Sequence, residues 1–86
     1  MKMFELKPTN GRKSFYGKAT VIEYDNGDIE LKSYDTIVAR ISDGKFKRLW
    51  NGYSATTMNH VNSFVNLFGI DGGGKNWWTS LEICNN

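Results

Sequence analysis

The sequence contains one cysteine and one histidine, too few for an intrachain disulfide or for a zinc site. Cys84 has no intrachain partner, so the fold does not depend on a disulfide. A zinc site needs several Cys or His ligands, and His60 and Cys84 lie far apart in the sequence. We therefore expect no metal and no cofactor. The position of Cys84 close to the last residue indicates a tail and not a nucleophile.

Long apolar runs are also missing. No run approaches the ~18 residues of a membrane-spanning helix, and the start lacks the apolar stretch of a signal peptide. We therefore expect a cytoplasmic protein. With 86 residues, 40% of them hydrophobic, and a net charge of +2, the chain is predicted to fold as one domain, residues 1–86. Within it, residues 1–12 form either an edge strand or a flexible segment, and residues 84–86 form a tail.

Charge is absent from one long stretch, which carries no Asp, Glu, Lys or Arg from Ser54 to Phe68. Ser54 is a helix cap and Gly69 is the residue just past the helix end. One predicted face is apolar, with residues at three-and-four spacing: Met58, Val61, Phe64, Val65 and Phe68. The other face is polar but uncharged, with these members: Thr56, Asn59, Ser63 and Asn66, flanked by Tyr53 and His60.

An uncharged polar face costs helix propensity, so solubility does not explain it. We predict a contact surface for a protein, either a target in a host cell or a second copy of the chain. The alternative is a surface helix of unusual composition, or a helix packed under the N-terminal segment.

Two hairpins are predicted before this helix. Residues 15–24 are rich in β-branched and aromatic residues, and the Asn26-Gly27 turn would pair Tyr24 with Ile29 and Ile22 with Leu31 on one apolar face. Residues 35–41 and 45–50 flank Asp43-Gly44. This second turn would produce three pairs: Ile41 with Phe46, Ile37 with Trp50, and Arg40 with Lys47.

After the helix, residues 70–74 form a loop and residues 75–81 a short helix whose tryptophans dock on the core; residues 82–86 form a short strand that fades to a tail. The predicted fold class is α+β: an antiparallel meander of about four strands with one helix on one face and a short C-terminal helix. Its expected buried core is Ile22, Tyr24, Ile29, Leu31, Ile37, Val61, Phe64 and Phe68.

Basic residues suggest a second kind of partner. Arg40, Lys47 and Arg48 cluster on the second hairpin among aromatic residues, a combination that suits nucleic acid. Lys75 follows three glycines and could contact an anion, although the spacing of a nucleotide-binding P-loop is absent. The alternatives are a solvated hairpin edge and a hinge between two helices.

Catalysis is not expected. As a general base His60 would need an orienting carboxylate; no Asp or Glu lies nearby in the sequence, although the fold could bring Asp35 or Asp71 close. We expect His60 to be a hydrogen-bonding surface residue and the protein not to be an enzyme.

Four segments together resemble one family: residues 13–19, 31–38, 50–62 and 74–81, with Gly52 to Met58 (GYSATTM) the most specific part. The chain is similar to small uncharacterised domains encoded by phages and mobile elements of gut and related bacteria. This resemblance implies a phage or mobile-element context and carries over no catalytic residue. The expected function is a small binding module that acts on a host protein or nucleic acid. The alternative is a counter-defence protein that sequesters a nucleotide or another small ligand.

Overall fold

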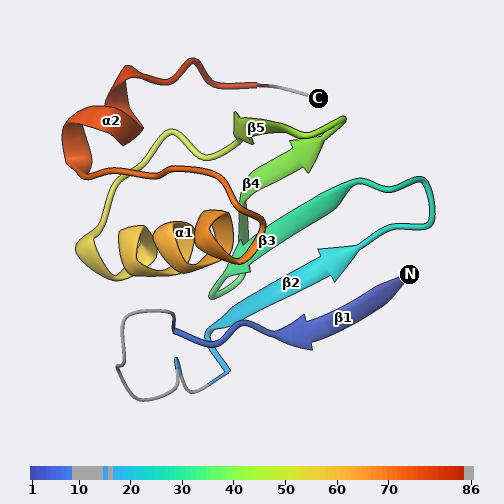
Figure 1. Ribbon diagram of the computed structural model, residues 1–86. Coiled ribbons are helices and arrows are strands. Elements are labelled where there is room, and N and C mark those ends of the chain that lie inside the picture. The colour runs from blue at the N-terminus through green and yellow to red at the C-terminus, as the bar shows by residue number, and fades with distance from the viewer. Residues whose placement is uncertain (9–14, 16, 85–86) are drawn as a thin grey trace.

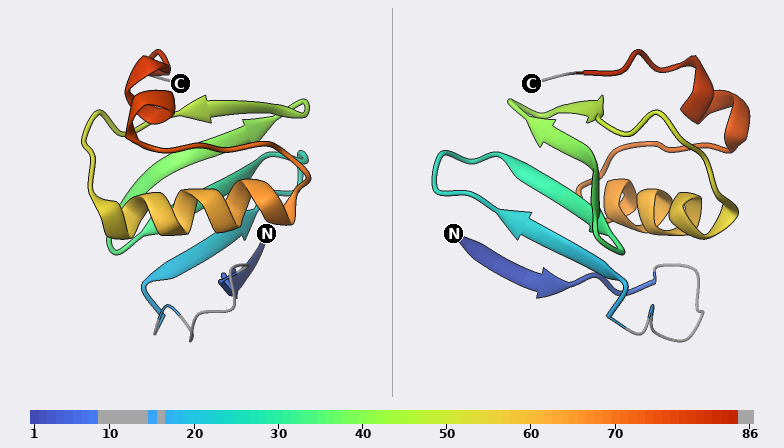
Figure 2. Two further views of the ribbon diagram at one scale, coloured as in Figure 1. Left: turned by 60° about the vertical axis from the view of Figure 1, so that its left-hand side comes forward. Right: turned by 180° about the vertical axis from the view of Figure 1, so that it is seen from behind.

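The computed structural model describes residues 1–8, 15 and 17–84. A five-stranded antiparallel sheet has its strands in chain order: β1 (Lys2–Glu5), β2 (Ala19–Glu23), β3 (Ile29–Ser33), β4 (Thr36–Ser42) and β5 (Lys45–Arg48). The helices α1 (Ala55–Leu67) and α2 (Lys75–Ser80) follow and lie on the same side of the sheet (Figures 1 and 2). The predicted α+β fold is confirmed, and β1 at the sheet edge is the edge strand given as one alternative for residues 1–12, in addition to the four strands of the predicted meander.

The register predicted for the first hairpin is wrong by one residue. Gly27 donates to the carbonyl of Tyr24 and has a φ of +95°, whereas Asn26 is not in the left-handed region. A type I turn followed by a left-handed glycine makes a three-residue loop, in place of the two-residue turn that Asn-Gly favours. The pairs become Glu23 with Ile29 and Val21 with Leu31.

A shift of one residue exchanges the two faces of a strand. Val21 is therefore fully buried in the core, while Tyr24 is 37% exposed on the other face of the sheet. Ile22 is buried as expected, but it also lies on that other face, opposite Glu30.

The second hairpin forms as predicted around its turn. Asp43 and Gly44 both have positive φ (53° and 75°), as a type I′ turn requires. Ile41 pairs with Phe46, and Arg40 pairs with Lys47. The predicted pair of Ile37 with Trp50 is absent, because an irregularity in the β3–β4 ladder at Leu31/Lys32 pairs Ile37 with Lys32 and turns it away from the core.

Local signals set both ends of α1. The side chain of Ser54 accepts from the N–H of Thr57, which caps the first turn. At the other end, Gly69 has a φ of +76° and donates to Asn66, while Ile70 donates to Val65 at 2.8 Å. This pair of bonds is a Schellman motif, so Gly69 is the residue just past the helix end, as predicted.

The core lies between the sheet and the two helices. Its fully buried members come from every layer: Leu6, Ala19, Val21, Leu31, Val38, Ala39, Val61, Phe64, Val65 and Trp78. Ile29 and Phe68 pack against this cluster partly buried, so the predicted core is confirmed except for Tyr24, Ile22 and Ile37.

The C-terminal part packs on the same core. Trp78 of α2 is fully buried and Trp77 packs beside it, as predicted for a helix whose tryptophans dock. Beyond α2, Ile83 makes a parallel bridge with Arg48, and Cys84 donates its N–H to the Arg48 carbonyl at 2.7 Å. Cys84 is thus held against β5 and is not part of a free tail; residues 85–86 of the predicted tail, and residues 9–12 of the N-terminal segment, lie outside the described residues.

Candidate functional site

The polar residues predicted on one face of α1 divide into two groups. Thr56 and Asn66 are exposed and Asn59 is half-buried, and Tyr53, just before the cap, is 41% exposed. His60 and Ser63 are buried, at 1% and 3% exposure. The prediction that these two residues lie on the outer surface is wrong, because this side of α1 packs against other parts of the protein.

His60 sits in a small buried polar cluster. Its Nδ1 lies 2.8 Å from the hydroxyl oxygen of Ser33 on β3, and that oxygen lies 3.1 Å from the Thr57 hydroxyl. The ring of Phe15 packs edge-on against the imidazole at 4.5 Å between centroids, and Tyr34 lies at 5.9 Å. Burial lowers the pKa of His60 from its ordinary value, which favours the neutral ring.

A serine within hydrogen-bond distance of a histidine is also how a nucleophile and its base are arranged. Here Ser33 is 2% exposed and His60 is 1% exposed, so a substrate would have no access to either atom. The part of the chain that the structure describes places no carboxylate on the imidazole to orient it. The cluster therefore joins β3 to α1 and satisfies buried polar groups.

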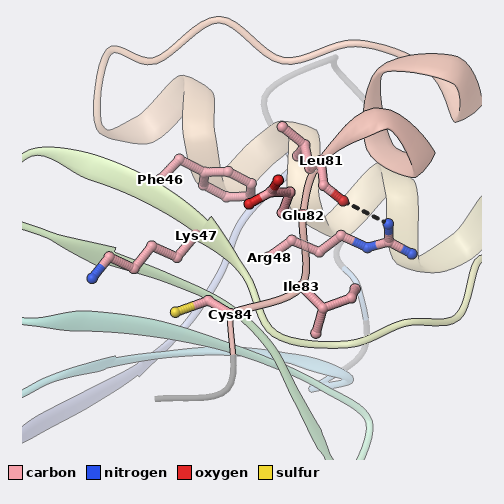
Figure 3. Close-up of a pocket in the computed structure, with 7 residues that line it drawn as sticks. All are labelled: Phe46, Lys47, Arg48, Leu81, Glu82, Ile83 and Cys84. Carbon is pink, nitrogen blue, oxygen red and sulfur yellow. Dashed lines mark hydrogen bonds between the residues drawn. The ribbon is translucent and has the colours of Figure 1, made fainter.

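Of the three basic residues predicted to cluster on the second hairpin, two lie side by side and the third does not. Arg40 forms an ion pair with Glu30, and Lys47 lies beside Arg40 on the sheet face away from α1. Arg48 points to the opposite side from Lys47 (Figure 3) and is 7% exposed. Lys75 begins α2 and lies over the ring of Tyr53 at 5.3 Å. The predicted cluster is therefore formed only in part, by Arg40 and Lys47.

Arg48 instead stabilises the packing of neighbouring segments. Its Nε donates to the Trp50 carbonyl at 2.9 Å and one terminal nitrogen donates to the Leu81 carbonyl at 3.1 Å. Its guanidinium stacks over the Trp78 ring at 4.8 Å. The Trp78 indole in turn donates to the Gly52 carbonyl at 2.7 Å. These bonds connect β5, the segment before α1 and the segment after α2, and the sequence gives no local signal for them.

The glycine loop before Lys75 also packs closely. A Cβ on Gly72 would lie 2.3 Å from the Asn62 side-chain oxygen, and one on Gly73 would lie 2.7 Å from the Trp77 Cβ. The Asn62 amide donates to the Gly73 carbonyl at 2.9 Å. Close approach to α1 and α2 therefore accounts for these two glycines without an anion.

On the sheet face away from α1, three side chains form one network. The Tyr24 hydroxyl donates to Glu30 at 2.6 Å, and Arg40 donates to the other carboxylate oxygen through Nε at 2.9 Å and Nη2 at 2.6 Å. The hydrogen bond to Glu30 raises the pKa of Tyr24, with burial and the Glu30 charge acting in the same direction. Sequence reasoning missed this network, since the register error turned Tyr24 inward.

Residues 4–80 match the model of a family of unknown function, DUF8033. The chain belongs to this family. The match begins in β1 and ends with the last residue of α2, so the DUF8033 domain comprises the sheet and both helices. No curated protein and no solved structure matches the chain.

In this DUF8033 domain a groove of about 490 Å³ runs between β5 and the segment that follows α2 (Figure 3). It is lined by Phe46, Lys47, Arg48, Leu81, Glu82, Ile83 and Cys84. Among the described residues, no group of three or more His, Cys, Asp or Glu side chains could hold a metal ion. None of the described helices is long and apolar enough to cross a membrane.

Proposed function

We propose that this chain is a small non-enzymatic binding module of phage or mobile-element origin, which acts in the cytoplasm on a protein of the host cell. The observation that carries the proposal is the exposed surface of α1. No Asp, Glu, Lys or Arg occurs between Arg48 and Asp71, yet Thr56, Asn66 and Leu67 are exposed, Leu67 to 50%. A solvated helix face without charge is unusual, and loss of charge is typical of the core of a protein interface.

The contacts of the basic residues favour a protein over nucleic acid as the partner. Arg48 is buried and Arg40 is neutralised by Glu30, so two of the three cations expected to contact phosphates are occupied. Sequestration of a nucleotide stays a prediction, and the packing of Gly72 and Gly73 supplies a different reason for the loop on which it depends.

The experiment is a pull-down from host lysate, with and without nuclease, using tagged wild-type protein and two variants. One variant combines Asn59→Glu with Asn66→Glu, and the other combines Thr56→Glu with Leu67→Glu. Both variants should fold. They should lose the partner, because burying the added carboxylates in an interface costs a large desolvation free energy. Light scattering on the same proteins separates a host target from a second copy of the chain.

The matched control carries Thr36→Glu and Asn76→Glu, which are exposed positions outside α1. It should retain the partner. Full retention by both α1 variants would reject α1 as the contact surface, and a partner that nuclease removes would reassign the function to nucleic acid.

A further inference from the structure

The face of the sheet away from α1 carries one continuous row of opposed residues. Met3 pairs with Ile22, Ile22 with Glu30, Glu30 with Arg40, and Arg40 with Lys47, so the row crosses all five strands. Directly opposed residues of antiparallel strands share a face. No helix of the described chain covers this face, since both helices lie on the other side (Figures 1 and 2).

The row changes character from one edge of the sheet to the other. On β1 and at the end of β2 it is apolar and accessible: Met3 is 55% exposed and Tyr24 is 37% exposed, next to the buried Ile22. On β5 it is cationic, with Lys47 in the row and the exposed Lys45 two residues before it on the same face. Neither lysine forms an ion pair with an acid of the described residues.

The middle of the row is rigid. Glu30 is only 6% exposed although no layer lies above it, because Tyr24 and Arg40 close over its carboxylate with three hydrogen bonds. Fixed side chains lose little conformational entropy on binding. The row is thus prearranged, with an apolar half and a cationic half.

We propose that this sheet face docks a protein segment that carries both carboxylates and an apolar side chain. Met, Tyr and Arg are enriched in protein interfaces, and the unpaired Lys45 and Lys47 supply complementary charge for Asp or Glu. Three strand spacings of about 4.8 Å separate Ile22 from Lys47, so the apolar anchor and the carboxylates would lie about 14 Å apart.

A second copy of the chain fits this face poorly. Stacking two such faces about an axis across the strands would place Lys47 over its own equivalent, which is repulsive. Stacking them about an axis along the strands would place the apolar half over the cationic half and desolvate the lysines without a partner.

Single-stranded nucleic acid would use the lysines but not Met3 and Ile22, and it would meet the carboxylates of Glu30 and Asp28. An acidic and apolar protein segment uses both halves.

The test is a selection of peptides from a displayed random 15-residue library against the immobilised whole protein. Enriched peptides should contain Asp or Glu near a large apolar residue, and their affinity should weaken as salt increases. The variant with Lys45→Glu and Lys47→Glu should lose about tenfold or more in affinity, and Met3→Ser should also weaken binding.

The matched control reverses two exposed lysines outside this row, Lys18 and Lys75, which lie over Tyr34 and Tyr53. Its total charge equals that of the Lys45/Lys47 variant, and it should bind the peptides as the wild type does. Circular dichroism confirms that each variant is folded, and Lys47→Gln provides a milder change at the same position.

Four results would overturn the proposal: no enriched peptide, enriched peptides without acidic residues, equal loss in the control, or loss only in the Asn59→Glu, Asn66→Glu variant of α1. The last result would place the peptides on α1 and leave the proposed function standing. Binding of a 20-nucleotide oligo(dT) that the Lys45/Lys47 variant abolishes would reassign the face to nucleic acid. The proposal does not rest on the α1 surface, so the two can fail separately.

Discussion

Ser33 and His60 are joined across the core, with 2.8 Å between the hydroxyl oxygen of Ser33 and Nδ1 of His60. This contact ties β3 to the first half of α1 and leaves the imidazole 1% exposed. A neutral ring satisfies the serine without placing a charge in the interior, so the protonation state of one residue contributes to the stability of the fold.

Stability should therefore decline in mild acid. Burial holds the pKa of His60 in the folded protein below its ordinary value, whereas the unfolded chain keeps a value of about 6.5. Well above pH 6.5 both states are neutral and the stabilisation is complete. As the pH falls below 6.5, the unfolded state takes up the proton first, so the free energy of unfolding decreases.

Urea unfolding between pH 7.5 and 5.5 measures this effect. His60→Gln removes the imidazole and keeps a polar side chain toward Ser33, so its stability should depend less on pH over the same range. Carboxylates titrate alike in both proteins and cancel in the comparison. Equal pH dependence in the two proteins would contradict the assignment.

Much of the fold could be predicted because its signals are local. The cap Ser54, the left-handed Gly69 and the Asp43-Gly44 turn each act within a few residues, and all three are confirmed. The register of the first hairpin could not be predicted, since Asn26-Gly27 fits both a two-residue and a three-residue loop. One residue of difference decided which face of β2 entered the core.

The candidate site was harder to predict than the fold. Helical spacing places Ser63 and His60 near Asn59, but it does not indicate what other elements bring against that side of the helix. The partners of His60 come from Ser33 and Phe15, and the long-range partners of Arg48 are Leu81 and Trp78. Such contacts between distant segments exist only once the chain has folded.

Truncation of Phe64 should be severe. The side chain is fully buried in α1 and packs edge-on against Phe68 at 5.4 Å between ring centroids. Phe64→Ala should lower the free energy of unfolding by about 3–5 kcal/mol through lost burial and the cavity left behind. The control is Leu67→Ala, because Leu67 is 50% exposed and its loss should change stability little. Thermal unfolding of both variants measures this difference, and similar melting temperatures would show that α1 is wrongly placed.

Loss of Arg48 should destabilise the C-terminal half. Arg48→Met keeps much of the apolar stem but leaves the Trp50 and Leu81 carbonyls without their donor. Each unsatisfied buried acceptor costs about 1–3 kcal/mol, so a total of about 2–6 kcal/mol is expected. Tryptophan fluorescence should change as well, since the guanidinium stacks on Trp78.

The matched variant is Lys47→Met, one residue earlier on the opposite face of β5, which should stay within about 0.5 kcal/mol of wild type. Replacing a buried charge by an apolar side chain is neutral in some proteins. A neutral Arg48→Met would therefore show that the two carbonyls find other donors and that this connection is dispensable.

Substitutions in the glycine loop would distinguish a packing role of the glycines from anion binding. Gly72→Ala would place a Cβ 2.3 Å from the Asn62 oxygen and 3.0 Å from Val65. Asn62 is held by its donations to the Met58 and Gly73 carbonyls at 3.0 and 2.9 Å, so turning it away loses both bonds. The expected loss of stability is about 1–3 kcal/mol. Gly74→Ala, where a Cβ meets nothing within 4 Å, should change stability by less than about 1 kcal/mol. If instead both variants keep wild-type stability but lose binding of inorganic phosphate in calorimetry, the loop holds an anion and the packing explanation is wrong.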